Sequence, residues 1–142
     1  CGTYPDRIAA GMALCGGTSL KDVSGLGRLP FWIIHGTADR AVPVSKSKTV
    51  VESLKRDGND TRLLYDWLKG ANHGAPARIF YLRKTYDWLF SHSLLDKDRP
   101  VRRDLTIGLD DLRRAYGDVR RNAGAPELIE GPSVIKGEGH EY

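Results

Sequence analysis

The stretch LPFWIIHGTADRAVP, residues 29–43, carries the strongest indication of fold in this chain of 142 residues. Its run Phe31–Ile34 is continuously apolar, too short for a helix, and rich in aromatic and β-branched residues. That pattern is typical of a strand buried on both faces of a parallel sheet. The strand leads into a glycine and then Asp39, and a second glycine-bearing stretch, GANHG at residues 70–74, contains His73.

Two further segments have strand character. Ile8 to Leu14 is small and apolar and ends in Cys-Gly-Gly, which suits a buried strand followed by a tight turn. Thr61 to Leu68 alternates between two sides, and the residues on the two sides are Leu63, Tyr65 and Trp67 against Leu64, Asp66 and Leu68. Trp32 and Trp67 are expected to lie in the core or on a sheet face.

Two helices are predicted between and after these strands. The first follows Pro43, with Ser45 as its cap and Gly58 at its end. The second runs from Pro76 to about His92. Its core-facing residues are expected to be Ile79, Leu82, Tyr86, Leu89 and Phe90. The order strand, strand, helix, strand, helix over residues 8–92 predicts an α/β fold with a parallel sheet.

Charge and composition argue against several classes of protein. The net charge is +4, and residues 1–92 hold 13 Lys and Arg against 8 Asp and Glu, whereas residues 93–142 hold 9 against 10. No basic stripe with interleaved aromatics is present, so we expect no nucleic-acid partner. No apolar run approaches the roughly 18 residues of a membrane span. The four histidines are dispersed without zinc-ligand spacing, and no metal is expected.

Asp39 and His73 form a candidate acid–base pair. Each follows a predicted strand by a few residues, and the carboxyl ends of parallel strands share one edge of a sheet. There an imidazole can move a proton while a carboxylate fixes its tautomer. Taken singly, Asp39 is explained as a turn or capping residue and His73 as a loop histidine without a task. Their spacing and the intervening helix favour the pair, and their neighbours Arg40 and Asn72 are candidates for shaping a pocket.

No residue of the sequence is a strong candidate for the nucleophile of such a pair. The motif G-x-S-x-G, which presents a nucleophilic serine on a sharp strand-to-helix turn, does not occur. Cys15 has the pattern of a buried small hydrophobe. Ser19 has one of the two glycines that the turn requires. Cys1 suits an N-terminal nucleophile or a lipid-modified first residue.

The remaining histidines have simpler interpretations. His35 is expected to be a packed histidine at the sheet edge. His92 is expected at the end of a helix, where a cation is favoured.

The chain resembles α/β-hydrolases, in particular bacterial polyhydroxybutyrate depolymerase-like, feruloyl and acetylxylan esterases and prolyl oligopeptidase-like hydrolases. Four stretches within about residues 3–92 carry the resemblance, and they are TYPDRIAAGMALCGG, LPFWIIHGTADRAVPVSKSKTVVESLKRDG, GANHG and TYDWLF. The resemblance implies that Asp39 and His73 are the acid and histidine of a catalytic triad. It also places the nucleophilic serine upstream of Cys1, and for this reason we expect the chain to be the C-terminal part of a serine hydrolase.

The fold expected from the resemblance is the C-terminal part of an α/β-hydrolase parallel sheet with flanking helices, plus a C-terminal helix and extended tail. We expect residues 1–95 to belong to the hydrolase domain and residues 96–142 to form an appendage. The amphipathic helix of the appendage is expected around Leu109, Leu112, Tyr116 and Val119.

Expected partners follow from the same reasoning. The substrate would be a small ester or an acylated carbohydrate, and no cofactor is implied. The first strand would expose an edge, so the chain is expected to need the N-terminal part of the same precursor or a second copy of itself. The chain alone is expected to be inactive. Two alternatives stay open, a peptidase of the prolyl oligopeptidase type and a non-catalytic hydrolase-like binding module.

Overall fold

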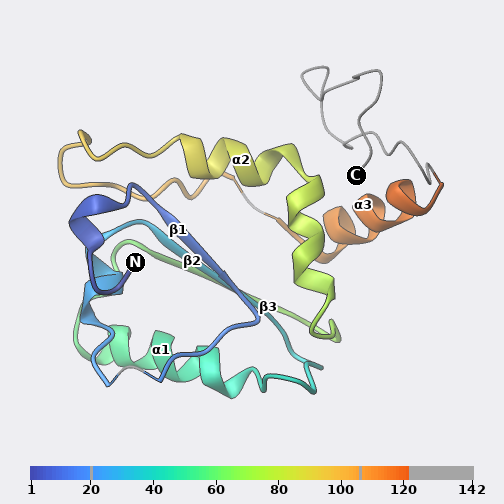
Figure 1. Ribbon diagram of the computed structural model, residues 1–142, viewed down its shortest axis with the longest axis horizontal. Coiled ribbons are helices and arrows are strands. Elements are labelled where there is room, and N and C mark those ends of the chain that lie inside the picture. The colour runs from blue at the N-terminus through green and yellow to red at the C-terminus, as the bar shows by residue number, and fades with distance from the viewer. Residues whose placement is uncertain (20, 106, 122–142) are drawn as a thin grey trace.

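A three-stranded parallel sheet forms the middle layer of the computed structural model, which describes residues 1–19, 21–105 and 107–121 (Figure 1). The strands are β1 (Gly11–Leu14), β2 (Phe31–Gly36) and β3 (Leu63–Leu68). The α-helices are α1 (Ser45–Arg56), α2 (Arg83–Phe90) and α3 (Leu109–Arg121), and the 3-10 helices are η1 (Pro5–Arg7), η2 (Ser24–Arg28) and η3 (Ala75–Tyr81). This architecture is the parallel α/β sheet with flanking helices that the sequence predicts.

The central strand β2 pairs with both neighbours in parallel register. Phe31 lies opposite Gly11 on β1 and Leu63 on β3. Every residue of β2 is buried, as expected of a strand covered on both faces. In the described part of the chain, β1 has a neighbouring strand on its β2 side only.

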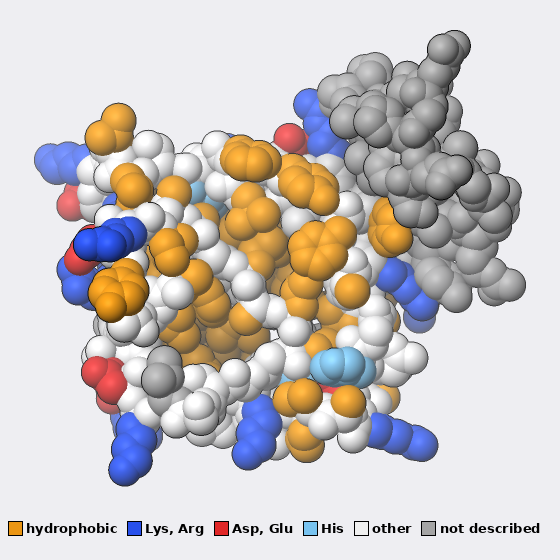
Figure 2. All heavy atoms as spheres, viewed as in Figure 1, with side chains coloured by type: hydrophobic (Ala, Val, Ile, Leu, Met, Phe, Trp, Pro, Cys, Tyr) orange, Lys and Arg blue, Asp and Glu red, His pale blue; other side chains and the backbone are white. Residues whose placement is uncertain are grey.

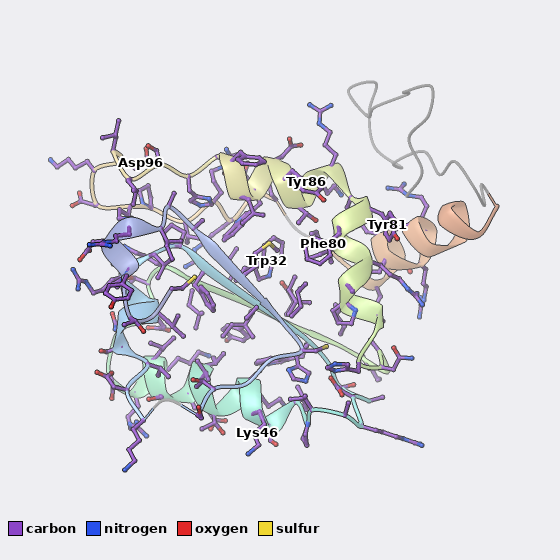
Figure 3. All side chains as sticks on the ribbon, viewed as in Figure 1. Trp32, Lys46, Phe80, Tyr81, Tyr86 and Asp96 are labelled. Carbon is purple, nitrogen blue, oxygen red and sulfur yellow. The ribbon has the colours of Figure 1, made fainter. Side chains whose placement is uncertain are left out.

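Side chains on the two faces of the sheet enter two separate cores. Trp32 and Ile34 join a cluster with η3, α2 and α3, and Figure 3 shows Trp32 between the strands and those helices. Phe31 and Ile33 pack instead with α1. Alternation along β3 follows the prediction, because Leu63 and Leu68 fall into opposite clusters.

Strand β1 is shorter than the predicted Ile8 to Leu14. The carbonyl oxygens of Ile8 and Ala9 accept hydrogen bonds from the guanidinium of Arg99, the latter at 2.9 Å. Arg99 also donates to the carbonyl of Pro5 at 2.8 Å. Those carbonyls are therefore held by a side chain and not by a neighbouring strand, and strand pairing begins at Gly11.

Helix α1 has the predicted apolar face but not the predicted cap. Val50, Val51 and Leu54 are buried against the sheet. The cap position is Val44, and the Ser45 side chain makes no capping bond. The Ser45 carbonyl instead accepts the Thr49 hydroxyl at 2.9 Å. At the other end Gly58 adopts φ 64°, the left-handed conformation that glycine allows at a helix end.

The prediction of one continuous helix from Pro76 to His92 is wrong, because the structure has two separate helices there. Leu82 is extended, with φ −104° and ψ 127°, and separates η3 from α2. The break turns α2 so that Thr85 and Trp88 are buried, while Phe90 is 83% exposed. Of the residues expected to face the core, Ile79 and Leu82 are fully buried, but Tyr86 and Phe90 point outward.

His92 corrects a second expectation, since it is a buried neutral side chain. Its Nδ1 donates to the Trp88 carbonyl at 2.7 Å, and its Nε2 accepts the Arg102 backbone N–H at 3.1 Å. An Nε2 proton would face another N–H, so the cationic form is disfavoured. Burial is the largest cause that lowers the pKa of His92.

The lowered pKa of His92 predicts a pH dependence of stability. The unfolded chain takes up this proton at about pH 6.5, where the folded chain does not. The contribution of His92 to the free energy of unfolding should therefore rise with pH up to about 6.5 and then level off. Chemical unfolding from pH 5 to 8 measures this, and His92→Gln should flatten the slope. The half-exposed His73 serves as the control, and an equal flattening in His73→Gln would contradict the assignment.

Several of the described residues beyond 95 contact the rest of the chain closely. Besides Arg99, Arg103 donates to the carbonyl of Thr61 at 2.8 Å. Ile107, Leu112 and Ala115 belong to the same buried cluster as Trp32. The division at residues 95 and 96 stays a prediction, and the expected tail beyond residue 121 lies outside the described residues. Among the described helices, none is long and apolar enough to cross a bilayer.

Candidate active site

The loops that follow β2 and β3 are joined at the carboxyl edge of the sheet. The Thr37 N–H donates to the Leu68 carbonyl and the Ala38 N–H to the Ala71 carbonyl, both at 3.0 Å. The Gly70 N–H donates to the Thr37 hydroxyl at 2.8 Å. These bonds set the loop that carries Asp39 beside the loop that carries His73.

The Asp39 side chain stabilises the turn that follows it. Its Oδ1 accepts the backbone N–H groups of Ala41 at 2.9 Å and Val42 at 2.8 Å, which is the usual behaviour of aspartate at a turn. The side chain is fully buried. Burial raises the pKa of the carboxyl, but the hydrogen bonds from Val42, His73, Cys15 and Ala41 outweigh it and hold the pKa well below its usual range. Asp39 is therefore a fixed anion.

His73 meets this anion directly. Its Nδ1 lies 2.7 Å from Asp39 Oδ2, as the sequence prediction of a hydrogen-bonded pair requires. Half of the His73 side chain, 51%, is exposed, and because Nδ1 faces the buried carboxylate, the exposed part of the ring is its Nε2 side. A cavity of about 580 Å³ opens before it, lined by Ala38, Arg40, Ala41, Asn72, His73 and Gly74. Arg40 and Asn72 thus line the pocket, as their positions suggested.

Two further side chains contact the anion, and the sequence did not assign them to the site. His35 Nε2 lies 3.2 Å from Asp39 Oδ2, and the Cys15 thiol is hydrogen-bonded to the same carboxylate. Both residues are buried. Cys15 follows β1 with a left-handed backbone, φ 48°, which a non-glycine residue rarely adopts. The signal that could have found both is their position at strand ends, next to the edge where Asp39 emerges.

Cys15, His35 and Asp39 bring three possible metal ligands within 4.8 Å of one another. Both ring nitrogens of His35 are hydrogen-bonded to protein oxygens, Nδ1 to Ser47 Oγ at 2.7 Å and Nε2 to the Val42 carbonyl at 2.8 Å. We therefore interpret the cluster as a hydrogen-bonded network around the carboxylate and assign no metal to it.

None of the candidate nucleophiles lines the cavity before His73. Cys15 lies behind the carboxylate, and burial is the main cause that raises the pKa of its thiol, against a hydrogen bond with the Gly36 backbone that lowers it. The Cys1 sulfur lies close to Gly11, at the opposite end of β1 from the site. Ser47 is buried and hydrogen-bonded to His35 and Gly16.

Comparison with known proteins agrees with this geometry. A model of the prolyl oligopeptidase family matches residues 19–95. The chain belongs to this family. The matched residues include both Asp39 and His73, so the paired loops lie within the part of the chain that is typical of prolyl oligopeptidase-family hydrolases.

A solved structure is also similar. The crystal structure of a thermostable esterase superposes with a TM-score of 0.56 and 25% sequence identity. The match covers 65% of this chain and 26% of the esterase chain. The chain therefore spans about a quarter of the length of that relative. A search of curated proteins gave no significant match.

Gly36 permits the close approach of the two site loops in this family member. A Cβ at Gly36 would lie 2.2 Å from the Ala71 carbonyl oxygen, which already accepts the Ala38 N–H. We expect Gly36→Ala to push the His73 loop away and to destabilise the chain by about 1–3 kcal/mol. Chemical unfolding measures the loss, and the downfield proton signal of the His73–Asp39 hydrogen bond should disappear.

Gly74→Ala is the matched control for this change. A Cβ at Gly74 would meet nothing closer than the Asn72 side chain at 3.9 Å. If both variants lost stability equally, the contact at Gly36 would not be the cause.

Proposed function

We propose that this chain supplies the general base and its orienting acid to a serine hydrolase that cleaves carboxylic esters, the substrate being a small ester or an acylated carbohydrate. The observation that carries the proposal is the 2.7 Å hydrogen bond between His73 and the buried Asp39, with the other side of the ring facing a cavity. Membership of a hydrolase family supports it, and the esterase relative favours an ester as substrate.

The proposed roles follow from where protons can move. His73 Nε2 takes the proton of the serine hydroxyl as the serine oxygen bonds to the ester carbonyl carbon. Asp39 keeps the Nδ1 proton in place and stabilises the imidazolium. The same proton then passes from Nε2 to the departing alcohol oxygen as the ester bond breaks. A water molecule repeats the two steps on the acyl-serine and releases the acid.

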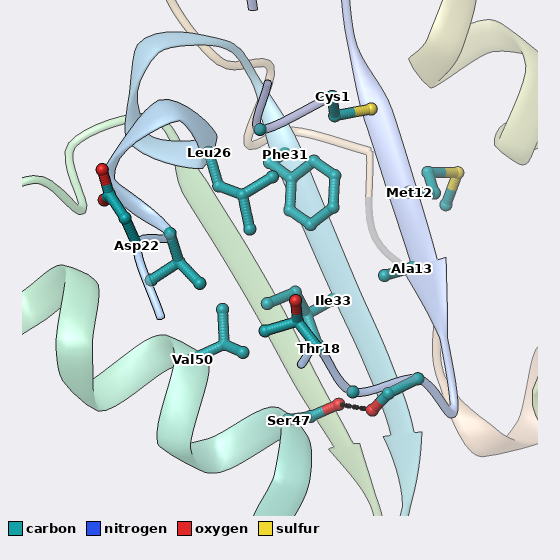
Figure 4. Close-up of a pocket in the computed structure, with 14 residues that line it drawn as sticks. Cys1, Met12, Ala13, Thr18, Asp22, Leu26, Phe31, Ile33, Ser47 and Val50 are labelled. Carbon is teal, nitrogen blue, oxygen red and sulfur yellow. Dashed lines mark hydrogen bonds between the residues drawn. The ribbon is translucent and has the colours of Figure 1, made fainter. Parts of the chain in front are cut away.

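The serine is proposed to lie in a segment outside these 142 residues. The sequence has no G-x-S-x-G, and no serine or cysteine lines the described cavity. A place for such a segment is the side of β1 that has no neighbouring strand among the described residues. Figure 2 shows a hollow with a hydrophobic floor on this face, and Figure 4 shows Phe31, Ile33 and Val50 lining an adjoining pocket of about 260 Å³. The N-terminal part of the same precursor would fit there, and a second copy of the chain is the alternative.

A peptidase is the second candidate function. Its specific support is the family itself, whose name describes cleavage of oligopeptides at proline. The acid and base would act identically, with an amine as the leaving group. The difference would lie in the pocket that receives the acyl side.

The test uses this chain and the complete product of its gene. We expect the complete product to hydrolyse p-nitrophenyl acetate and to be labelled by a fluorophosphonate probe on a serine outside residues 1–142. We expect neither reaction from the chain alone. His73→Ala in the complete product should abolish both, because triad members act as a unit.

Each alternative has its own outcome in this test. Faster cleavage of a prolyl p-nitroanilide than of the ester would favour the peptidase. A complete product that hydrolyses and binds neither substrate would favour the non-catalytic binding module. Turnover by the chain alone that survives replacement of both cysteines would overturn the placement of the nucleophile.

A further inference from the structure

His35 lies directly behind the acid of the proposed pair and is fully buried. Its Nε2 is 2.8 Å from the Val42 carbonyl and 3.2 Å from Asp39 Oδ2, so this nitrogen faces two oxygen acceptors. On the other side of the ring, Nδ1 is 2.7 Å from Ser47 Oγ. The hydroxyl in turn donates to the Gly16 carbonyl at 2.8 Å, as Figure 4 shows.

The number of protons available to these contacts determines the protonation state of the His35 imidazole. Nε2 needs a proton, because carbonyl and carboxylate oxygens only accept. Ser47 has a single proton, which the Gly16 carbonyl takes. Nδ1 must then supply a proton to Ser47 Oγ. A neutral ring has one N–H and would leave one of these three contacts without a proton, whereas an imidazolium satisfies all three.

The Asp39 carboxylate is the counter-ion of a charged His35 ring. A buried cation is costly unless it is paired and hydrogen-bonded. The titratable groups that face His35 are the Asp39 carboxylate and the Cys15 thiol at the end of β1. His73 stands on the far side of the same carboxylate. Asp39 Oδ2 is thus shared by two histidines, one buried and one open to the cavity.

We propose that His35 is held as an imidazolium by the Ser47–Gly16 contact and is a positioning residue for Asp39, an inference whose catalytic part rests on the proposed function. The cation fixes Oδ2 from behind while Ala41 and Val42 fix Oδ1. It also offsets part of the carboxylate charge. His73 Nδ1 therefore faces a carboxylate whose net negative charge is reduced.

Nuclear magnetic resonance of the 142-residue chain tests the charge of His35 without any activity. Long-range ¹H–¹⁵N correlation distinguishes an imidazolium, whose two nitrogens have similar shifts, from a neutral ring, whose nitrogens differ widely. The His35→Gln variant identifies the His35 signals by their loss. At pH 7 we expect two protonated nitrogens, and widely separated shifts would overturn the proposal.

Ser47→Ala gives the sharper variant. It removes the acceptor of the Nδ1 proton, and His35 should become neutral with Nε2 alone protonated. Ser45→Ala is the matched control, because Ser45 is exposed on the same helix and makes no side-chain cap. A His35 spectrum unchanged by Ser47→Ala would also overturn the proposal.

The positioning role is tested in the complete gene product. In His35→Gln, which keeps a donor near Nε2 but removes the charge, the acid limb of the pH–rate profile should move up by roughly one pH unit. A limb that does not move refutes the positioning role even if the ring is cationic. If His73→Ala leaves hydrolysis intact while the His35 spectrum is as expected, the proposed function fails and the charge assignment stands.

Discussion

Asp39→Asn in the complete gene product is expected to lower kcat on the order of 10⁴-fold with little change in KM. An amide at this position can present its NH₂ group to His73 Nδ1, which then loses its proton to Nε2. The base would be blocked by the proton it already holds. Steady-state hydrolysis of a chromogenic ester measures the loss, with circular dichroism to verify folding.

Asp66→Asn is the matched control for this prediction. Asp66 is also partly buried, and burial is the main cause that raises the pKa of its carboxyl. Its Oδ2 accepts the Trp32 Nε1 proton at 2.6 Å, on strand β3 and away from the cavity lining. An asparagine oxygen can accept the same proton, so kcat should be unchanged. Equal losses in the two variants would mean that Asp39 acts through folding and not on His73.

The buried strands were predictable because their local pattern and their environment agree. Phe31–Ile34 is apolar throughout, and the strand it belongs to is covered on both faces. The alternation of β3 places Leu63 and Leu68 in opposite cores. Parallel strands bring their carboxyl ends to one edge, and that rule, together with the spacing of the two residues and the intervening helix, predicted the proximity of Asp39 and His73.

The errors arose where tertiary contacts override local pattern. Helical spacing from Pro76 onward cannot show that Leu82 is extended, because the break is fixed by burial of Leu82 and Trp88 on the sheet. From its position near a helix end, His92 is expected to be a cation. In the structure, Arg102, ten residues away, donates its backbone N–H to the His92 ring. Each mistake concerns a residue whose partner lies outside the window in which periodicity is visible.

The surroundings of His35 could not be predicted for a related reason. Its neighbours Cys15, Ser47 and Val42 come from the end of β1, from α1 and from the loop after β2. Sequence placed His35 correctly at the sheet edge. A single sequence does not indicate which hydroxyl and which carbonyl meet its two nitrogens, and those contacts determine whether the ring carries charge.

The largest loss of stability is expected from Trp88→Ala, at about 3–5 kcal/mol. Trp88 is fully buried and meets Trp32 edge to face, with ring centroids 5.2 Å apart. Its Nε1 donates to the Arg102 carbonyl at 2.9 Å. Truncation would therefore open a cavity between sheet and helices and leave the Arg102 carbonyl without its donor. Urea unfolding followed by far-ultraviolet circular dichroism measures the change.

Phe90→Ala provides the comparison within the same helix. Phe90 lies two residues after Trp88 in a stretch where both look equally apolar, yet it is 83% exposed. Its truncation should change the free energy of unfolding by no more than about 0.5 kcal/mol. The difference between the two variants tests the break at Leu82, because a continuous helix from Pro76 would bury Phe90 and turn Trp88 outward. A larger loss in Phe90→Ala than in Trp88→Ala would restore the continuous helix and contradict the orientation of α2.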